Sequence, residues 1–597
     1  MPAPSPITAT SDLASFAIKA NGTDVDDRYD IISVTVDYAL NRIPTARILI
    51  RDGSAASESF SVSAGTDFAP GVKIQVLAGY HENNAAVFSG VVIKSSIQMQ
   101  RGGNSSLTIT CRDPAVVMTI GRRSACYTST TDGDVMTSLI TRHSLSAAVS
   151  STTDQLEEIT QFAASDWDFL LARAEANGMV VSIANGTVTV QPPALSASPV
   201  LGVTYGIDIL DVSLEEDVRT QISSVACVSW DPSTQAIVTA SDTIKNDNPL
   251  GGDKSTVLAQ VTGSDPYALN TTTPLTAATL KIWGDAQLLK SSLAKIRGTL
   301  RFQGSTGILP GQTLEISGLG ERFDGNGYVS AVTQEIKDGN WTTLVTIGLD
   351  PAWFAARPDV SAPPAYALLP GVQGLQLGTV MKIDQDPGNQ FRVQVKVPIV
   401  DNTGKGIWAR LARPYATKNA GSFFYPEIGD EVVLAFLDDD PRFPVIIGSL
   451  FSSSRPPPLT PDAKNSQKAI ITNAQLKVLF DEEKKIITLI TPANNTVVIS
   501  DDAKAITLTD QNSNSIKLGT DGITLTSASN VLIKAAQNIT LQAQGGKLAA
   551  TAAQAATVSG LSVSLTAQTE FTASGNASAA LTSSGQTKVQ GSLVMIN

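Results

Sequence analysis

Ala505-Ile506-Thr507-Leu508-Thr509 and Gly522-Ile523-Thr524-Leu525-Thr526 are two of several short alternating segments towards the C-terminal end of the chain. In each segment aliphatic residues alternate with polar ones, and turn residues interrupt the pattern about every eight to ten residues, which is typical of half-buried strands with one apolar face. The same series contains Ser515-Ile516-Lys517-Leu518, Val531-Leu532-Ile533-Lys534 and Asn538-Ile539-Thr540-Leu541-Gln542. We therefore predict a β-ribbon over residues 470–597.

This predicted ribbon contains too little apolar bulk to form a core of its own. Phe571 is the only aromatic residue after Phe480, so a single copy would leave its apolar face uncovered and its strand edges open to aggregation. Several copies wound around one another would cover each apolar face with a neighbouring chain. We interpret residues 470–597 as an intertwined β-prism, and the chain as an obligate oligomer.

The end of the predicted prism is almost uncharged. Residues 541–597 contain only Lys547, Glu570 and Lys588 as charged residues, among Ala, Thr, Ser and Gln. A disordered tail is one interpretation, but single apolar residues recur along the stretch and favour an ordered, narrow rod. The apolar end suggests a docking platform for a separate tip protein, and the alternative is a bare, blunt apex. The candidate tip-docking residues are Leu593, Val594, Met595 and Ile596.

Composition limits the function classes. A length of 597 residues predicts about three to five domains. The formal net charge of −12 disfavours nucleic acid or an anionic membrane surface as a partner of the whole molecule. Cys111, Cys126 and Cys227 are too widely spaced to indicate a disulfide framework or a zinc site, and we expect buried, inert thiols. The start of the chain has no signal-peptide pattern, and no apolar run of about 18 residues occurs, which predicts synthesis and assembly in the cytoplasm.

Residues 1–361 are predicted to form a β-rich hub. We expect a first hub β-barrel over residues 1–115, an α+β insertion over 116–200 and a second hub β-barrel over 201–361. The expected strands of the first barrel lie near residues 31–36, 46–50, 72–76, 87–92 and 107–110.

Three helices are expected in the hub. The clearest begins after Ser165, which is a good N-cap, and ends at Gly178. Its predicted buried stripe is Trp167, Leu170, Leu171 and Ala174. A second helix is expected over residues 132–149, with Asp132 or Asp134 as its cap, and a third over 275–296, opened by Pro274.

The hub contains an internal repeat. Gly71-Val72-Lys73-Ile74-Gln75-Val76 matches Gly311-Gln312-Thr313-Leu314-Glu315-Ile316, and both halves later reach an Asp-Pro-Ala sequence, at Asp113 and at Asp350. We interpret this as a duplication. Two similar barrels per chain would give six barrels in a trimeric ring, which matches the symmetry of a sixfold tube. The candidate tube-docking residues are Gly71, Ile74, Val76, Gly311, Leu314 and Ile316.

A Pro/Ala linker near Pro363 separates the hub from another small β-domain. Residues 371–455 contain five short strands with Gly and Pro turns, which predicts an OB-fold barrel. We count nine basic and nine acidic residues in this barrel, a balance that argues against single-stranded nucleic acid as its ligand. A short extended linker then leads to the prism.

The barrel also resembles a known family. Trp408-Ala409-Arg410, the run Phe424-Tyr425-Pro426-Glu427-Ile428-Gly429-Asp430-Glu431-Val432 and Pro444-Val445-Ile446-Ile447-Gly448 are similar to the OB domain of VgrG spike proteins. Ser165-Asp166-Trp167-Asp168-Phe169-Leu170 and Ser229-Trp230-Asp231-Pro232 look like the hub of the same family. The resemblance extends over essentially the whole chain, with the domains in the order of this family. VgrG proteins resemble the hub and the spike of contractile phage tails fused into one chain.

The resemblance implies a mainly β homotrimer with duplicated hub barrels, an OB-fold barrel and a triple-stranded β-prism (β-helix). Its implied function is that of the structural spike of a contractile injection machine, of the type VI secretion or the extracellular phage-tail-like kind. The implied partners are a hexameric inner tube protein, a PAAR-type tip protein, baseplate proteins and effector cargo. The target membrane would be pierced on contraction rather than inserted into. The alternatives are a trimeric surface adhesin or fibre with a receptor-binding tip and a cell-wall hydrolase spike; the latter would need an inserted domain, for which the gap between barrel and prism is too short.

No residue pattern indicates catalysis, a metal or a cofactor. His81 is expected in a hairpin tip and His143 on a helix, and neither is accompanied by a Gly-x-Ser-x-Gly sequence. Asp438-Asp439-Asp440 lacks the ligand spacing of a calcium loop, and Glu215-Glu216 has no aromatic sugar cleft in view. We expect structural roles for all of these residues and predict that the chain is not an enzyme.

Overall fold

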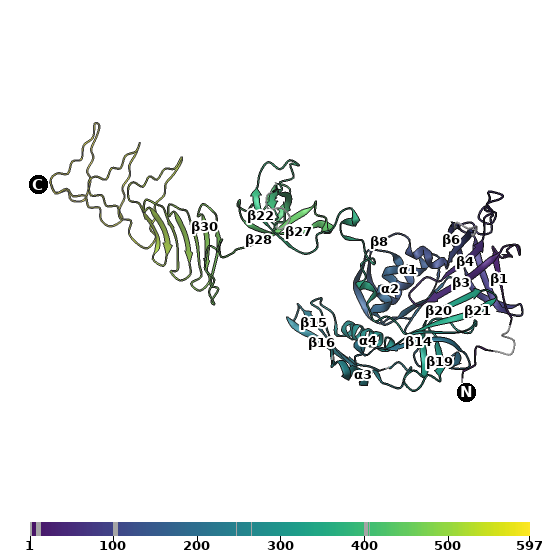
Figure 1. Cartoon of the computed structure of the whole chain (residues 1–597). Coiled ribbons are helices and arrows are strands. Elements are labelled where there is room, and N and C mark those ends of the chain that lie inside the picture. The colour runs from purple at the N-terminus through teal and green to yellow at the C-terminus, as the bar shows by residue number, and fades with distance from the viewer. Residues whose placement is uncertain are drawn as a thin grey trace. The chain divides into compact units, whose positions relative to one another are not determined.

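The computed structural model describes residues 3–7, 13–99, 105–245, 247–263, 265–398, 404 and 406–596. The chain divides into two units, Met1–Leu450 and Phe451–Asn597. Strands are the main regular elements of the first unit and the only ones in the described part of the second (Figure 1). In the described part of the chain, every helix is too short or too polar to cross a membrane.

The largest sheet of the first unit has thirteen strands and contains both halves of the predicted repeat. The strands of the first half are β1 (Ala14–Ala20), β2 (Thr23–Asp24), β3 (Ile31–Ala39), β4 (Thr45–Arg51), β5 (Lys73–Tyr80), β6 (Asn83–Met99) and β7 (Ser105–Arg112). Those of the second half are β13 (Leu201–Thr204), β14 (Ile209–Glu216), β18 (Ile296–Gln303), β19 (Thr313–Ser317), β20 (Gly325–Lys337) and β21 (Asn340–Ile347). Antiparallel pairing of β3 with β20 joins the two halves into one sheet, and Figure 1 shows these strands side by side.

The two halves have the same strand order, which confirms the duplication. The order is β3-β4-β7-β6-β5 in the first half and β14-β18-β21-β20-β19 in the second. The turn glycines Gly71 and Gly311 both have φ of 91° and donate to equivalent carbonyls, of Val92 at 2.9 Å and of Val329 at 2.8 Å. Directly after these two valines, β6 and β20 each carry a register shift. A shared bulge at equivalent positions is a conserved feature of a duplicated unit rather than a chance likeness.

The insertion between the halves contains eight elements with a core of its own. They are η1 (Pro114–Thr119), β8 (Arg123–Thr131), α1 (Asp132–Thr141), β9 (Ser146–Val149), β10 (Gln155–Ala164), α2 (Asp166–Ala176), β11 (Val180–Ala184) and β12 (Thr187–Gln191). Helix α2 is as predicted: the Ser165 hydroxyl accepts from the backbone N–H of Asp168 at 3.0 Å. The predicted stripe packs into this core: Trp167, Leu170, Leu171 and Ala174.

Helix α1 begins at Asp132 as predicted, but its cap residue and its C-terminal end differ from the prediction. Thr131, rather than Asp132 or Asp134, caps the helix. The helix ends at Thr141, whereas a helix to residue 149 was expected. Residues 146–149 instead form β9, which pairs in parallel with β12, because sheet pairing outweighs a local helical pattern in a short Ala-rich segment.

A second insertion, within the second half of the repeat, was not recognised in the sequence. It contains η2 (Val218–Thr220), β15 (Ser224–Asp231), β16 (Ala236–Thr243), α3 (Ser255–Thr262), β17 (Tyr267–Asn270) and α4 (Ala277–Leu293). Helix α4 corresponds to the predicted helix over 275–296, but Thr276 caps it and it is shorter at both ends. Its Leu280 and Leu288 pack against Val225 and Cys227 of the small sheet.

The OB-fold prediction is confirmed by a closed five-stranded barrel. Its strands are β22 (Gln376–Lys382), β23 (Val393–Lys396), β24 (Ile407–Leu411), β27 (Glu431–Phe436) and β28 (Pro444–Ser449). They close in the order β22-β23-β24-β28-β27, with the β24–β28 pair parallel. A small hairpin, β25 (Ala416–Thr417) and β26 (Ala420–Gly421), lies between β24 and β27, and η3 (Phe354–Ala356), η4 (Pro364–Ala367) and η5 (Leu437–Asp439) are single turns.

The second unit begins with a seven-stranded antiparallel meander. Its strands are β29 (Gln467–Ile471), β30 (Lys477–Asp481), β31 (Ile486–Ile490), β32 (Thr496–Ser500), β33 (Ala505–Thr509), β34 (Ser515–Gly519) and β35 (Gly522–Thr526). The strands predicted at residues 531–534 and 538–542 are absent: from 527 to 596 the described chain contains no strand. These segments have no neighbouring segment of the same chain to complete a hydrogen-bonded ladder, and a strand exists only where such a partner is present.

Candidate assembly surfaces

Two rows of apolar side chains cross the meander on one face. The strand register places Ile487 opposite Ile499 and Leu508 opposite Ile516, and the same pairing continues across β30–β35. The first row is Phe480, Ile487, Ile499, Ile506, Leu518 and Ile523. The second row is Val478, Leu489, Val497, Leu508, Ile516 and Leu525. We call these two sets the aliphatic rows, since every member except Phe480 is aliphatic.

The aliphatic rows are uncovered in the single chain. Leu508 and Ile516 are both 40% exposed, and Ile523 is 76% exposed. Among the described residues of this unit, the only buried one is Ser500. An unpartnered apolar face of this extent is expected to be covered by another surface, and a unit without buried apolar residues lacks the main driving force for folding alone.

The candidate tip-docking residues are exposed in the single chain. Leu593, Val594, Met595 and Ile596 have between 47% and 89% of their surface accessible. They belong to a stretch from 527 to 596 in which apolar residues recur without a buried neighbour, as Leu561 and Phe571 illustrate. Their accessibility is compatible with a contact to another protein.

The candidate tube-docking residues are placed differently from what docking requires. Ile74 and Val76 on β5 belong to the core of the first half, and Leu314 and Ile316 on β19 to that of the second. Each is at most 1% exposed. The sequence pattern identified equivalent strands correctly, but their aliphatic positions face inward, so these four side chains are corrected to core residues. Gly71 and Gly311 lie in the turns that precede these strands.

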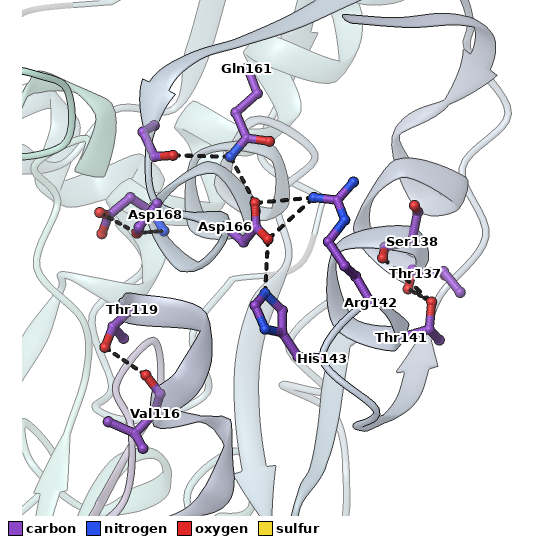
Figure 2. A network of polar contacts seen from close by, with 12 residues as sticks. Val116, Thr119, Thr137, Ser138, Thr141, Arg142, His143, Gln161, Asp166 and Asp168 are labelled. Atoms are coloured by element: carbon purple, nitrogen blue, oxygen red, sulfur yellow. Dashed lines mark hydrogen bonds and ion pairs between the residues drawn. The ribbon is translucent and has the colours of Figure 1, made fainter. Parts of the chain in front are cut away.

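The polar residues with catalytic potential are engaged in structural contacts. The Asp166 carboxylate at the start of α2 contacts Gln161 Nε2 at 2.9 Å, His143 Nε2 at 2.8 Å and Arg142 Nη1 at 3.2 Å, and Figure 2 shows the three side chains converging on it. Burial raises the pKa of Asp166, but the hydrogen bonds from Gln161 and His143 and the charge of Arg142 outweigh it and hold the pKa below its usual range. His143 follows α1 rather than lying on it, and it helps to lock α1 to α2.

The other candidates lie in turns or ion pairs, except that Glu216 Oε1 is buried without a hydrogen-bond partner among the described residues, and burial raises the pKa of Glu216. His81 occupies the tight β5–β6 turn, with φ of 52°. Asp440 is paired with Arg442 at 2.6 Å, and Glu215 with Arg297 at 3.3 Å. No group of three or more potential metal ligands occurs within the described ranges. Cys126 is exposed, contrary to expectation, whereas Cys111 and Cys227 are buried.

One largely buried ionic contact has no counterpart in the sequence predictions. Lys290 on α4 pairs with Glu175 on α2, donates to the carbonyl of Ala352 at 2.9 Å and lies over the Trp353 ring. Glu175 in turn accepts from the backbone N–H of Phe354 at 2.6 Å. This network anchors the segment that leaves the second half of the repeat. Its members are far apart in sequence and no local pattern marks them, so only the tertiary structure reveals it.

The chain matches two family models. Residues 10–338 match the Alg8 N-terminal domain, and residues 376–451 match the type VI secretion system/phage-baseplate injector OB domain. Among curated proteins, the type VI secretion system spike protein VgrG1a of Pseudomonas aeruginosa is 33% identical over 69 residues, which is 12% of this chain and 11% of that protein. The spike protein VgrG3 of Vibrio cholerae is 31% identical over 145 residues, which is 22% of this chain and 13% of that protein. Each match therefore spans only a small part of the relative's length.

Solved structures give more extended but more distant matches. The 43 kDa tail protein of prophage MuSo2 from Shewanella oneidensis has a TM-score of 0.42 at 11% identity, covering 57% of this chain and 98% of its own. A tail protein from Neisseria meningitidis has a TM-score of 0.42 at 14% identity, covering 58% and 99%. The predicted resemblance to VgrG spike proteins is confirmed by the matches to the curated spike proteins and to the OB-domain model. Because the Alg8 N-terminal model matches more than half of the chain, the chain belongs to that family, and it carries in addition the OB domain of type VI secretion and phage-baseplate injectors.

Proposed function

We propose that this chain is the structural hub and spike of a contractile injection machine, in which three copies assemble around one axis. The observation that carries the proposal is the pair of aliphatic rows, which no part of the described chain covers. Two further copies of the same ribbon supply matching rows and also the missing strand partners for residues 527–596. The resulting element is an intertwined β-prism.

The free energy available from covering the rows is large. The rows contain twelve side chains, and removing the remaining exposed surface of each contributes about 1 kcal/mol. The total, about 12 kcal/mol per chain, is comparable to the whole stability of an ordinary domain. A prism held in this way transmits axial force, because pulling out one chain exposes the rows of all three copies and breaks the hydrogen bonds that residues 527–596 form with the other chains.

The duplicated hub fits a sixfold partner. Three chains, each with two equivalent halves of one sheet, present six similar units around the axis. We propose that this ring caps a hexameric inner tube, that baseplate proteins hold it, and that effector cargo travels with it. Since the aliphatic positions of β5 and β19 are buried, docking on these strands would use outward positions such as the exposed Lys73 on β5.

We further propose that the apolar end of the prism, Leu593–Ile596, carries a PAAR-type tip protein, and that contraction drives tip and prism through the target envelope. The role is mechanical rather than catalytic. The particle is assembled in the cytoplasm before it acts on the target cell.

The molar mass of the full-length protein in solution, measured by multi-angle light scattering, tests the proposal. We expect the mass of three chains for the full-length protein and of one chain for a truncation ending at Arg455, because the truncation removes the aliphatic rows. A monomeric full-length protein would contradict both the prism and the spike.

A further inference from the structure

The OB barrel contains an open pocket that the assembly does not explain. Its volume is about 550 Å³, within the range of small-molecule sites. It is formed by the loop between β22 and β23, by β24 and by the loop between β27 and β28. These are the positions with which OB folds bind oligonucleotides and oligosaccharides. The lining residues that matter are Gln390, Arg392, Trp408, Arg410, Arg442 and Phe443.

Both loops of the pocket are held in place by an internal carboxylate. Asp386 accepts the backbone N–H of Gln390 at 2.8 Å and pairs with the guanidinium of Arg392 at 2.7 Å. Asp440 accepts the backbone N–H of Arg442 at 2.9 Å and pairs with its guanidinium at 2.6 Å. The two carboxylates are largely shielded from solvent, with side chains 6% and 9% exposed. Each loop therefore keeps its arginine in a fixed position, so little conformational entropy would be lost when a ligand binds.

The lining combines cations with aromatic faces. Trp408 and Arg410 are two residues apart on β24 and thus share one face of the strand. Phe443 lies on the facing loop and is exposed. The lining contains three guanidinium groups, and two of them, those of Arg392 and Arg442, are already paired with Asp386 and Asp440, so Arg410 supplies the remaining positive charge. Such a site recognises a ring with an apolar face that also carries a negative charge.

We propose that this pocket binds an acidic oligosaccharide, with Trp408 stacked on a pyranose ring and Arg410 paired with a carboxylate or phosphate group of the sugar. An acidic sugar supplies an apolar C–H face and one charge within the space that the pocket provides. A nucleic acid strand would need a basic groove that follows several phosphates, and the barrel as a whole carries as many acidic as basic residues.

Titration calorimetry on the full-length protein tests this assignment. The probe is a tetramer of galacturonic acid, with its fully methyl-esterified tetramer as the neutral counterpart and octathymidylate as the nucleic acid. We expect the acidic tetramer to bind about tenfold more tightly than the neutral one. Arg410→Glu is expected to abolish this preference for the acidic tetramer. Trp408→Ala is expected to lower the affinity for both tetramers by the same factor.

Lys418→Ala is the matched control, because it also removes an exposed positive charge from the barrel but does not line the pocket. It should leave binding unchanged. If Arg410→Glu lowers the thermal midpoint of the protein, the binding measurement is made with Arg410→Gln instead. The assignment is overturned if the acidic tetramer does not bind, if Lys418→Ala weakens binding as much as Arg410→Glu, or if octathymidylate binds more tightly than the sugar. The molar mass of the same sample shows whether the trimer is intact, so this outcome is separate from the test of the spike.

Discussion

Leu508→Ala probes the aliphatic rows most directly. Leu508 lies between Val497 and Ile516 in its row, and 40% of its surface is exposed in the single chain. In the proposed prism a neighbouring copy covers this remainder, which by itself contributes about 1 kcal/mol. The substitution also leaves a cavity between the chains, which raises the total cost to about 3 kcal/mol per chain. Because the symmetric assembly contains the substitution three times, the free energy of trimer dissociation is expected to fall by about 9 kcal/mol.

Thr507→Ala is the control for this experiment. Thr507 is the preceding residue on β33 and faces the opposite side of the meander. Its replacement is expected to change the free energy by less than about 1 kcal/mol. The assay is a guanidinium titration in which light scattering follows the trimer. Equal midpoints for Leu508→Ala and Thr507→Ala would refute the conclusion that the aliphatic rows are buried between chains.

Two further predictions concern the hub. Lys290→Ala removes the positive charge beside Glu175 in a site where the two side chains are only 12% and 15% exposed, so the hub should lose about 3 kcal/mol of unfolding free energy in a urea titration. The control Lys281→Ala removes a half-exposed lysine from the same helix and should cost less than about 1 kcal/mol; equal losses would contradict the assignment. The pKa of Asp166 is lower in the folded chain than in the unfolded chain. Its contribution to stability is therefore complete above the pKa of the unfolded chain and is lost as the pH falls through the pKa of the folded chain. Asp166→Asn should flatten the decline of the thermal midpoint below about pH 4, and an unchanged decline in acid would contradict this.

Local patterns were sufficient where the decisive interactions are local. Ser165 caps α2 as predicted because the hydroxyl and the N–H that it accepts are three residues apart. The strands of the hub and the OB barrel followed from alternation, since one buried face imposes a period of two. The repeat was visible as the two turn glycines Gly71 and Gly311 and the two Asp-Pro-Ala sequences. In each Asp-Pro-Ala sequence the aspartate carboxylate accepts the backbone N–H of the alanine: Asp113 from Ala115 at 2.9 Å, and Asp350 from Ala352 at 3.0 Å.

Predictions failed where distant segments compete for the same residues. Residues 146–149 have a helical pattern but form β9, because β12 offers them a parallel partner. The tube-docking candidates were chosen from a repeated pattern, and such a pattern cannot distinguish a face conserved for packing from one conserved for contact. The sequence pattern also does not predict the pocket of the OB barrel, because closure of the barrel is what brings Arg392, Arg410 and Arg442 into one lining.

The sequence by itself determined the OB-fold barrel, the duplication and the alternating strands at the start of the ribbon, since these depend on composition and on periodicity along the chain. Only the tertiary structure decided that the two hub halves share one sheet through β3 and β20, that the aliphatic positions of β5 and β19 face inward, and that Lys290 and Glu175 meet. Each of these depends on which distant segments come into contact, and the free energy of such contacts is set by packing in three dimensions rather than by the residues on either side.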